Sequence, residues 1–538
     1  MASETKKIPA EGDGIQPVTS TQIVIDEDNV KHIVTDAGDE AVQFLASVGP
    51  FPPMSPDQEK KLVRKIDRWM IPMLLFLGLF GAVDKVQLAT GALYGFKEDN
   101  HLKGQEYSWL GSILSIGMLV GIWPSTYLVH RLPAGKYIGA CSFCWSIMTL
   151  CIAACHNWAG LMVLRFMMGV FEAIITPGLT LLISVFWKKS EQPIRNGVIM
   201  SVFSSVVNGF LSWVVGKIPS DAPLARWQYL YLLTGSINVL YSSFMLFYLP
   251  NSPINAKFLS LEERWHAVQR LADNRTGIDN NQWNWDQAWE AVFDLKIWIM
   301  FLFNIAINIP NGGLITFGAI IIDSLGFDPQ TSSLLSMPNG IISTISGFIA
   351  TYYASKWQGR RTFVVMIATL PPLIGTALVY GVPRSSTGVQ MFGLYLMYCY
   401  WGKKSVDVFG LHPITDKPIG PYVTAVSLPQ ANTAGSTKKV VAYGILLLGY
   451  SAGNLIGPQT FRDDQAPAYT GGTVAMLTCY CVAIFLMCLY FLTARFQNRR
   501  KDQRYGKPVR VDTENFSSVI ETYQNLSDRK QEDFRYIY

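Results

Sequence analysis

Long runs of apolar residues recur from about residue 69 to about residue 494, and they constrain the fold more than any other feature. A helix that crosses the roughly 30 Å hydrocarbon layer of a bilayer needs about 20 apolar residues. The segments that meet this requirement are 69–93, 107–129, 137–155, 158–186, 196–216, 228–249, 296–321, 332–354, 362–381, 388–428 (interrupted), 439–458 and 472–494. Only 15% of the residues are charged, against about 25% in soluble domains. We therefore expect an all-α membrane protein with twelve transmembrane helices.

The spans fall into two groups of six, which predicts two six-helix bundles joined by a linker. The expected parts are a disordered N-terminal tail (1–58), the first bundle (59–249), a central loop (250–294), the second bundle (295–494) and a C-terminal tail (495–538). The aromatic residues of the central loop suit either an amphipathic helix at the membrane surface or an ordinary solvated linker helix.

Basic residues gather at one side of the predicted spans, as expected for cytoplasmic loops. They include Lys60, Lys61, Arg64, Lys65, Arg68, Arg131, Lys136, Lys356, Arg360, Arg361, Lys438, Lys439, Arg495, Arg499 and Arg500. Both tails and the central loop are therefore predicted to be cytoplasmic.

Four ionisable residues lie deep inside predicted spans: Asp84 and Lys85 in the first, and Arg165 and Glu172 in the fourth. A charge at the centre of a bilayer costs at least about 2.5 kcal/mol, so such residues face a cavity or one another. Asp84 lies ~22 Å from the cytoplasmic face and Arg165 ~10 Å from the opposite face, at 1.5 Å per helical residue. In a core of about 30 Å these two residues meet at nearly the same depth.

The chemistry of these four residues suits the coupled movement of an anion and a proton. A carboxyl group removed from water can take up a proton, which makes Asp84 and Glu172 candidates for proton coupling. Lys85 and Arg165 are candidates to hold an anionic substrate, because the fork of an arginine matches a carboxylate. Two buried ion pairs that only fix helix packing are the alternative.

Two asparagines, Asn311 and Asn454, are further candidates for substrate binding. Asn311 lies in a stretch rich in Pro and Gly (308–313) that either unwinds the seventh span beside a ligand or only permits close packing. Asn454 lies in the glycine-rich run 449–457, where packing is the competing explanation.

No pattern points to an enzyme, a cofactor or a metal site. The histidines are scattered, no phosphate-binding loop is present, and the net charge of +5 is too dispersed to suggest nucleic acid. A proton gradient is therefore the expected driving force.

These residues resemble the anion:cation symporter branch of the major facilitator superfamily, and more closely the fungal allantoate permease family. The similar motifs are 83–86, 165–178, 249–253, 274–277, 309–313 with Phe317, 432–435 and 437–439. The resemblance implies that Asp84, Lys85, Arg165 and Glu172 line a central cavity, in which the acids couple protons and the bases bind the anion. It further implies alternating access by rocking of the two bundles.

Two departures from the family pattern stand out. Residues 129–136 lack the aspartate of the usual signature between the second and third spans. Residues 403–420 interrupt the tenth span with charges and prolines, which cannot cross lipid as a helix. The hypothesis is a retained intron in the gene sequence, which a transcript that contains these codons would rule out.

The expected function is import of a small organic anion, such as allantoate, nicotinate or a related carboxylate, by a proton-coupled monomer in the plasma membrane. A secondary-metabolite exporter and a non-transporting nutrient sensor are the alternatives. Lipid, protons and the anion are the expected partners, without nucleic acid.

Overall fold

The structure, a computed structural model, describes residues 22–25, 31–34, 44–45, 47–48, 51–188, 191–192, 195, 199, 204–219, 221–272, 284–356, 361–400, 428–429, 432–506, 527–532 and 534–538. Most of these residues are helical. The exceptions among the regular elements are two short strands in the predicted N-terminal tail, β1 (Gln22–Ile25) and β2 (Lys31–Val34), which pair in an antiparallel sense.

The first bundle contains α2 (Pro56–Ala92), α3 (Phe96–Asp99), α4 (Glu106–Arg131), α5 (Ala134–Ile152), α6 (Trp158–Glu172), α7 (Ile175–Phe186), α9 (Ser204–Gly216) and α10 (Arg226–Tyr248). The linker contains η1 (Pro253–Asn255), α11 (Leu261–Ala272) and α12 (Trp285–Val292). The second bundle contains α13 (Leu295–Asp323), α14 (Pro329–Lys356), α15 (Arg361–Gly381), α16 (Thr387–Met397), η3 (Tyr398–Tyr400), α18 (Ser436–Gln459), η4 (Asp463–Gln465) and α19 (Thr470–Tyr505).

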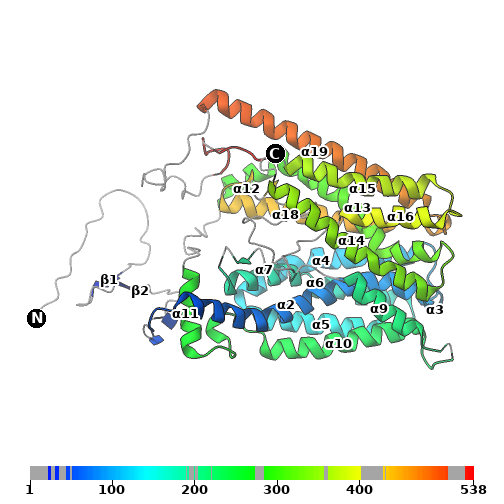
Figure 1. Cartoon of the computed structure of the whole chain (residues 1–538), viewed down its shortest axis with the longest axis horizontal. Coiled ribbons are helices and arrows are strands. Elements are labelled where there is room, and N and C mark those ends of the chain that lie inside the picture. Colours follow the sequence, from blue (N-terminus) through cyan, green and yellow to red (C-terminus); the bar gives the residue numbers. More distant parts are fainter. Residues whose placement is uncertain are drawn as a thin grey trace, which may run out of the picture.

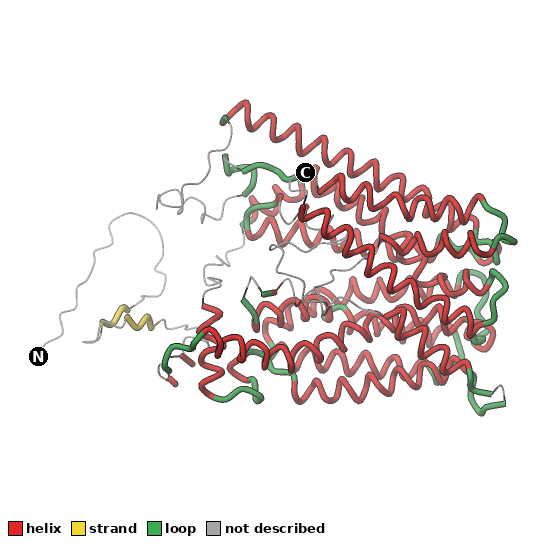
Figure 2. The backbone as a smooth tube through the Cα atoms, viewed as in Figure 1, coloured by secondary structure: helices red, strands yellow, loops and turns green. Residues whose placement is uncertain are grey.

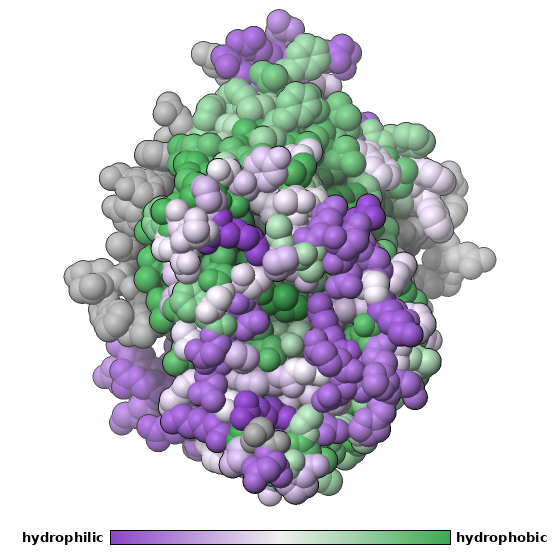
Figure 3. All heavy atoms as spheres, turned by 90° about the vertical axis from the view of Figure 1, so that its right-hand side faces the viewer, coloured by the Kyte–Doolittle hydropathy of each residue, from purple (hydrophilic) through white to green (hydrophobic). Residues whose placement is uncertain are grey.

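The long helices lie roughly parallel in two groups, one built from α2 to α10 and the other from α13 to α19 (Figure 1, Figure 2). The beginning of α2, the linker helix α11 and the end of α19 lie at the same end of the molecule, which we call the linker end. The short helix α3 lies at the other end, which we call the α3 end. Hydrophilic residues gather over much of the α3 end, whereas apolar residues dominate above them (Figure 3).

Local sequence signals explain where the first helix begins. Ser55 caps α2: its Oγ accepts from the backbone nitrogen of Gln58, while the Gln58 side chain accepts from the backbone nitrogen of Ser55. Pro56 occupies the first helical position, where a missing N–H costs nothing. The helix therefore starts thirteen residues before the apolar span predicted from residue 69.

Glycines bring α4 and α6 into close contact. A Cβ on Gly117 would lie 2.2 Å from the carbonyl oxygen of Phe166, and one on Gly169 would lie 2.2 Å from that of Leu114. Real side chains do not tolerate such distances. Small residues let backbones approach in membrane bundles, where van der Waals packing replaces the hydrophobic effect between helices. This contact fixes the position of α6, which carries two of the predicted site residues.

Nine helical stretches among the described residues are long and apolar enough to cross a membrane. Of the other three predicted spans, the eighth contains α14, while α9 and α16 cover parts of the fifth and the tenth, so the described residues are consistent with twelve spans. The predicted fourth span is divided, because a turn at residues 173–174 separates α6 from α7. The predicted second bundle ends at residue 494, whereas α19 continues to Tyr505.

For the seventh span, the structure contradicts one of the two expectations drawn from its sequence. Unwinding at residues 308–313 is wrong, because α13 runs without a break through Pro310. Transmembrane helices tolerate proline where neighbouring groups satisfy the freed carbonyl. Gly312 and Gly313 instead accommodate neighbours, since a Cβ on each would lie within 2.8 Å of Asn454 or Phe461. The suspected insertion at 403–420 lies outside the described residues.

Candidate functional site

The two adjacent charges of α2 contact different helices. Asp84 Oδ2 accepts a hydrogen bond from Thr149 Oγ1 of α5 at 2.8 Å. Lys85 Nζ forms an ion pair with Glu172 Oε1 of α6, also at 2.8 Å. Successive residues of a helix project about 100° apart, so a single α2 reaches both neighbours from one turn.

Arg165 lies on α6, as Glu172 does, and is almost fully buried, with 2% of its surface exposed. Its Nε donates to the carbonyl oxygen of Leu110 in α4 at 2.8 Å. Asp84 interacts electrostatically with both Arg165 and Glu172. The structure thus gathers the four charged residues singled out in the sequence, from α2 and α6, into one neighbourhood.

Each of three charged groups keeps a polar atom that is buried and lacks a hydrogen-bond partner among the described residues. These atoms are Asp84 Oδ1, Arg165 Nη1 and Glu172 Oε2. Burying a polar group without a partner is unfavourable, and such atoms therefore mark places where a ligand or a proton would be stabilised.

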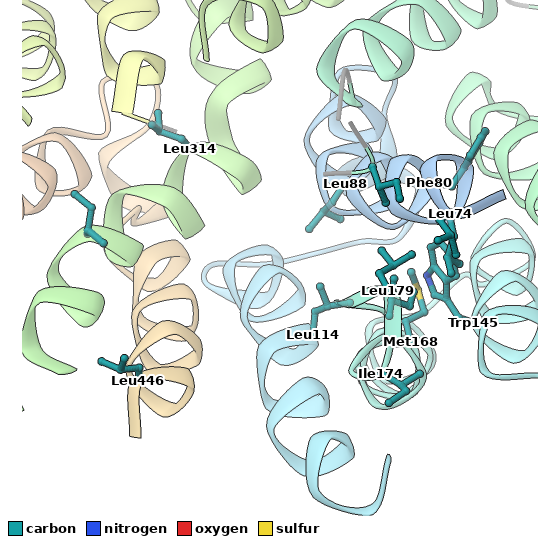
Figure 4. Close-up of a cluster of buried hydrophobic side chains, with 14 of the residues drawn as sticks. Leu74, Phe80, Leu88, Leu114, Trp145, Met168, Ile174, Leu179, Leu314 and Leu446 are labelled. Carbon is teal, nitrogen blue, oxygen red and sulfur yellow. The ribbon is translucent and has the colours of Figure 1, made fainter. Parts of the chain in front are cut away.

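Buried apolar side chains lie on the same helices as these charged residues. Figure 4 shows Leu88, Leu114 and Met168, which belong to α2, α4 and α6, with Leu314 and Leu446 apart from them in the second bundle. Apolar surroundings hold the local dielectric constant low, which strengthens every interaction between the charges.

The second bundle contributes the two asparagines, and they contact each other. Asn311 Nδ2 donates to Asn454 Oδ1 at 2.9 Å, and Asn454 Nδ2 donates to Asn308 Oδ1 at 3.2 Å and to the carbonyl oxygen of Tyr450 at 2.9 Å. Among the described residues, no hydrogen bond joins these asparagines to the charges of the first bundle. Tyr450, which lies one turn before Asn454 in α18, interacts electrostatically with Lys85.

Three residues near the charges were not predicted from the sequence: Thr149, Tyr231 and Tyr450. Tyr231 of α10 is buried and interacts electrostatically with Arg165 and Asp84. Hydroxyl groups are common in transmembrane helices, so these residues carry little signal of their own. One signal could have predicted them: the depth of each polar residue of the third, sixth and eleventh spans in the membrane, compared with the depth of the four charged residues.

The two bundles meet through hydrogen bonds at the α3 end. Tyr107 donates to the carbonyl oxygen of Thr316, Ser108 to that of Phe461, and Gln330 to that of Gly216. The stacked rings of Phe317 and Phe461 lie beside them at 4.8 Å. Lys97 lies over the rings of Tyr107 at 4.4 Å and Phe317 at 5.8 Å, which ties the bundles further. These contacts join the two bundles on the side of α3.

Comparison with known proteins agrees with this architecture. Residues 73–458 match the Major Facilitator Superfamily. An MFS-type transporter of Penicillium expansum is 35% identical over 95% of this chain and 93% of its own length. The allantoate permease of Saccharomyces cerevisiae is 28% identical over 97% of this chain and 94% of its own.

Among solved structures, a bacterial homolog of the human lysosomal transporter Spinster, in an inward-facing and unoccupied conformation, has a similar fold. The TM-score is 0.58 and the identity 14%, over 80% of this chain and 97% of that one. A likeness at this identity concerns the fold alone. With a match to the family over most of its length and an all-helical fold, the chain belongs to the major facilitator superfamily of membrane transporters.

Proposed function

We propose that the protein imports a small organic anion together with protons by alternating access. The observation that carries this proposal is the ion pair between Lys85 and Glu172, of which Glu172 is only 5% exposed. Buried ion pairs contribute little to stability compared with apolar packing, so their presence in a transporter favours a functional role.

The pair links anion binding to proton binding by competition. Lys85 cannot offer its full charge to a substrate while Glu172 holds it. A proton on Glu172 cancels the carboxylate charge and frees the ammonium group for an anion. The anion and the proton therefore favour each other's binding, which is the thermodynamic requirement for symport.

Asp84 and Arg165 support the same scheme from the neighbouring positions. Asp84 hydrogen-bonds to Thr149 without a salt-bridging partner among the described residues, so its neutral, protonated form suits the site. Arg165 uses Nε on a backbone carbonyl and keeps Nη1 for a carboxylate. Tyr450, Asn454 and Asn311 would face the substrate from the second bundle.

The contacts at the α3 end favour a state that is closed there and loads or releases its substrate at the linker end. The basic residues near the linker end support a cytoplasmic location for it and for both termini. We assign the protein to the plasma membrane as a monomer, in keeping with the family resemblance.

The test is uptake of labelled allantoate and nicotinate by proteoliposomes that contain the purified protein, with and without an imposed pH gradient. We expect accumulation only when the side of entry is acidic, and its loss with a protonophore. Flux that follows the gradient outward identifies an exporter. Failure of a broad panel of organic acids to bind or move would favour a sensor.

A further inference from the structure

A segment that follows α19, Ser527–Tyr538 as far as it is described, packs against the second bundle at the linker end; we call it the strap. Near the start of the strap, Asp528 is completely buried and makes its main contacts with the bundle. Asp528 Oδ1 accepts from Lys438 Nζ at 2.6 Å, and Oδ2 accepts from the Tyr536 hydroxyl at 2.8 Å. Lys296 Nζ lies 3.9 Å from Oδ2 and 3.6 Å from the centre of the Tyr536 ring.

Side-chain amides of the bundle bind the backbone of the strap in a reciprocal way. Asn432 donates to the carbonyl oxygen of Ile537 at 2.6 Å and accepts from its N–H at 2.6 Å. Asn498 makes the same pair of bonds with Tyr536, both at 2.8 Å. Each amide satisfies a donor and an acceptor of one residue, so the strap is held in a defined register.

Lys501 near the end of α19 adds a third anchor. Its Nζ donates to the carbonyl oxygens of Asp528 and Gln531 at 2.6 and 2.7 Å, and to that of Phe534 at 3.3 Å. The strap thereby contacts the ends of α13, α18 and α19 at once.

The residues that bind the strap also bind the linker. Lys438, which is fully buried, lies 2.7 Å from Glu290 of α12 and 3.1 Å from Asp294, in addition to Asp528. Arg529 of the strap donates to the carbonyl oxygen of Phe293 at 3.4 Å. A buried lysine needs compensating charge, and Asp528 supplies part of it from outside the bundle. Asn432 and Lys438 belong to the family-like motifs 432–435 and 437–439, which contribute no residue to the proposed transport site.

We propose that the strap is a clamp that holds the linker-end termini of α13, α18 and α19 together and fastens α12 to the second bundle, with docking dependent on Asp528. Because α12 ends the linker, the clamp determines how firmly the second bundle is attached to the segment that connects it to the first. The clamp is separate from the substrate site and does not depend on the transported compound.

Hydrogen–deuterium exchange of the full-length protein in lipid nanodiscs tests the clamp. For Asp528→Asn we expect exchange to rise roughly tenfold or more at the amides of Tyr536 and Ile537, and also in α12 and the first turn of α18. Glu532→Gln is the matched control, because this strap residue is exposed and should leave exchange unchanged. Tyr536→Phe removes only one of the bonds to Asp528 and should give a smaller rise at the same places, so the test survives if the asparagine variant does not fold.

Exchange that stays at the wild-type rate in Asp528→Asn would overturn the clamp. A rise confined to the strap itself, with α12 and α18 unchanged, would overturn it as well, since the segment would then be a passive tail.

Discussion

Replacing Glu172 by glutamine tests the proposed competition for Lys85. The 2.8 Å pair has an attraction of about 6 kcal/mol at an effective dielectric constant of about 20. Lys85 is 23% exposed, and solvent screens part of this attraction. We take about 2 kcal/mol as the part that an incoming anion must replace, which corresponds to roughly thirtyfold in Kd.

Glu172→Gln keeps the shape and the hydrogen-bonding oxygen but removes the charge, so Lys85 is available at every pH. We expect the variant to bind the anion more tightly than wild type does, and its affinity to depend less on pH. The variant should lose proton-driven accumulation while retaining counterflow exchange, because the anion no longer depends on a proton at this position.

The assay is equilibrium binding of labelled allantoate or nicotinate to purified protein, followed by counterflow in proteoliposomes. Glu98→Gln, an exposed acid-to-amide change in α3, is the matched control and should behave as wild type. If Glu172→Gln showed the same affinity and the same pH dependence as wild type, the competition between substrate and Glu172 would be wrong.

Three further predictions concern the neighbourhood of the pair. Arg165→Ala should abolish anion binding in the same assay, whereas Arg165→Lys should retain part of it. If the two variants bound the anion equally, Arg165 would not belong to the substrate site. Thr149→Val removes the hydrogen bond to Asp84, so the pH midpoint of uptake should move while the maximal rate at the optimum stays similar; an unmoved midpoint would separate Asp84 from proton coupling. Gly169→Ala should destabilise the protein by about 1–3 kcal/mol through the clash between α6 and α4, seen as a lower Tm, whereas Gly444→Ala, with open space around its Cα, should not; equal Tm values would contradict the close contact.

The lengths of the apolar runs and the positions of the charges predict much of this architecture directly. Lipid offers no partner to backbone groups, so each long apolar run has helix as its available form. The same requirement makes Asp84, Lys85, Arg165 and Glu172 conspicuous, since a charge in such a run needs a specific partner. Depth along each helix then predicts which of them can meet.

The partners themselves are not visible in the linear pattern. Lys85 pairs with Glu172 and Asp84 contacts Thr149 because of how α2 is rotated relative to α5 and α6. Pro310 predicts a break as readily as a continuous helix, and the packing of α13 against α18 determines that the helix continues.

The sequence by itself determined that the chain crosses a membrane as helices and that charged residues of the first and fourth spans lie at similar depth, because insertion cost and helical rise are local properties. Only the tertiary structure decided which atoms pair, that Asn311 binds Asn454, and that Asp528 reaches Lys438 from 90 residues away. Those contacts depend on helix rotation and on how segments distant in the chain dock, and no local pattern records either.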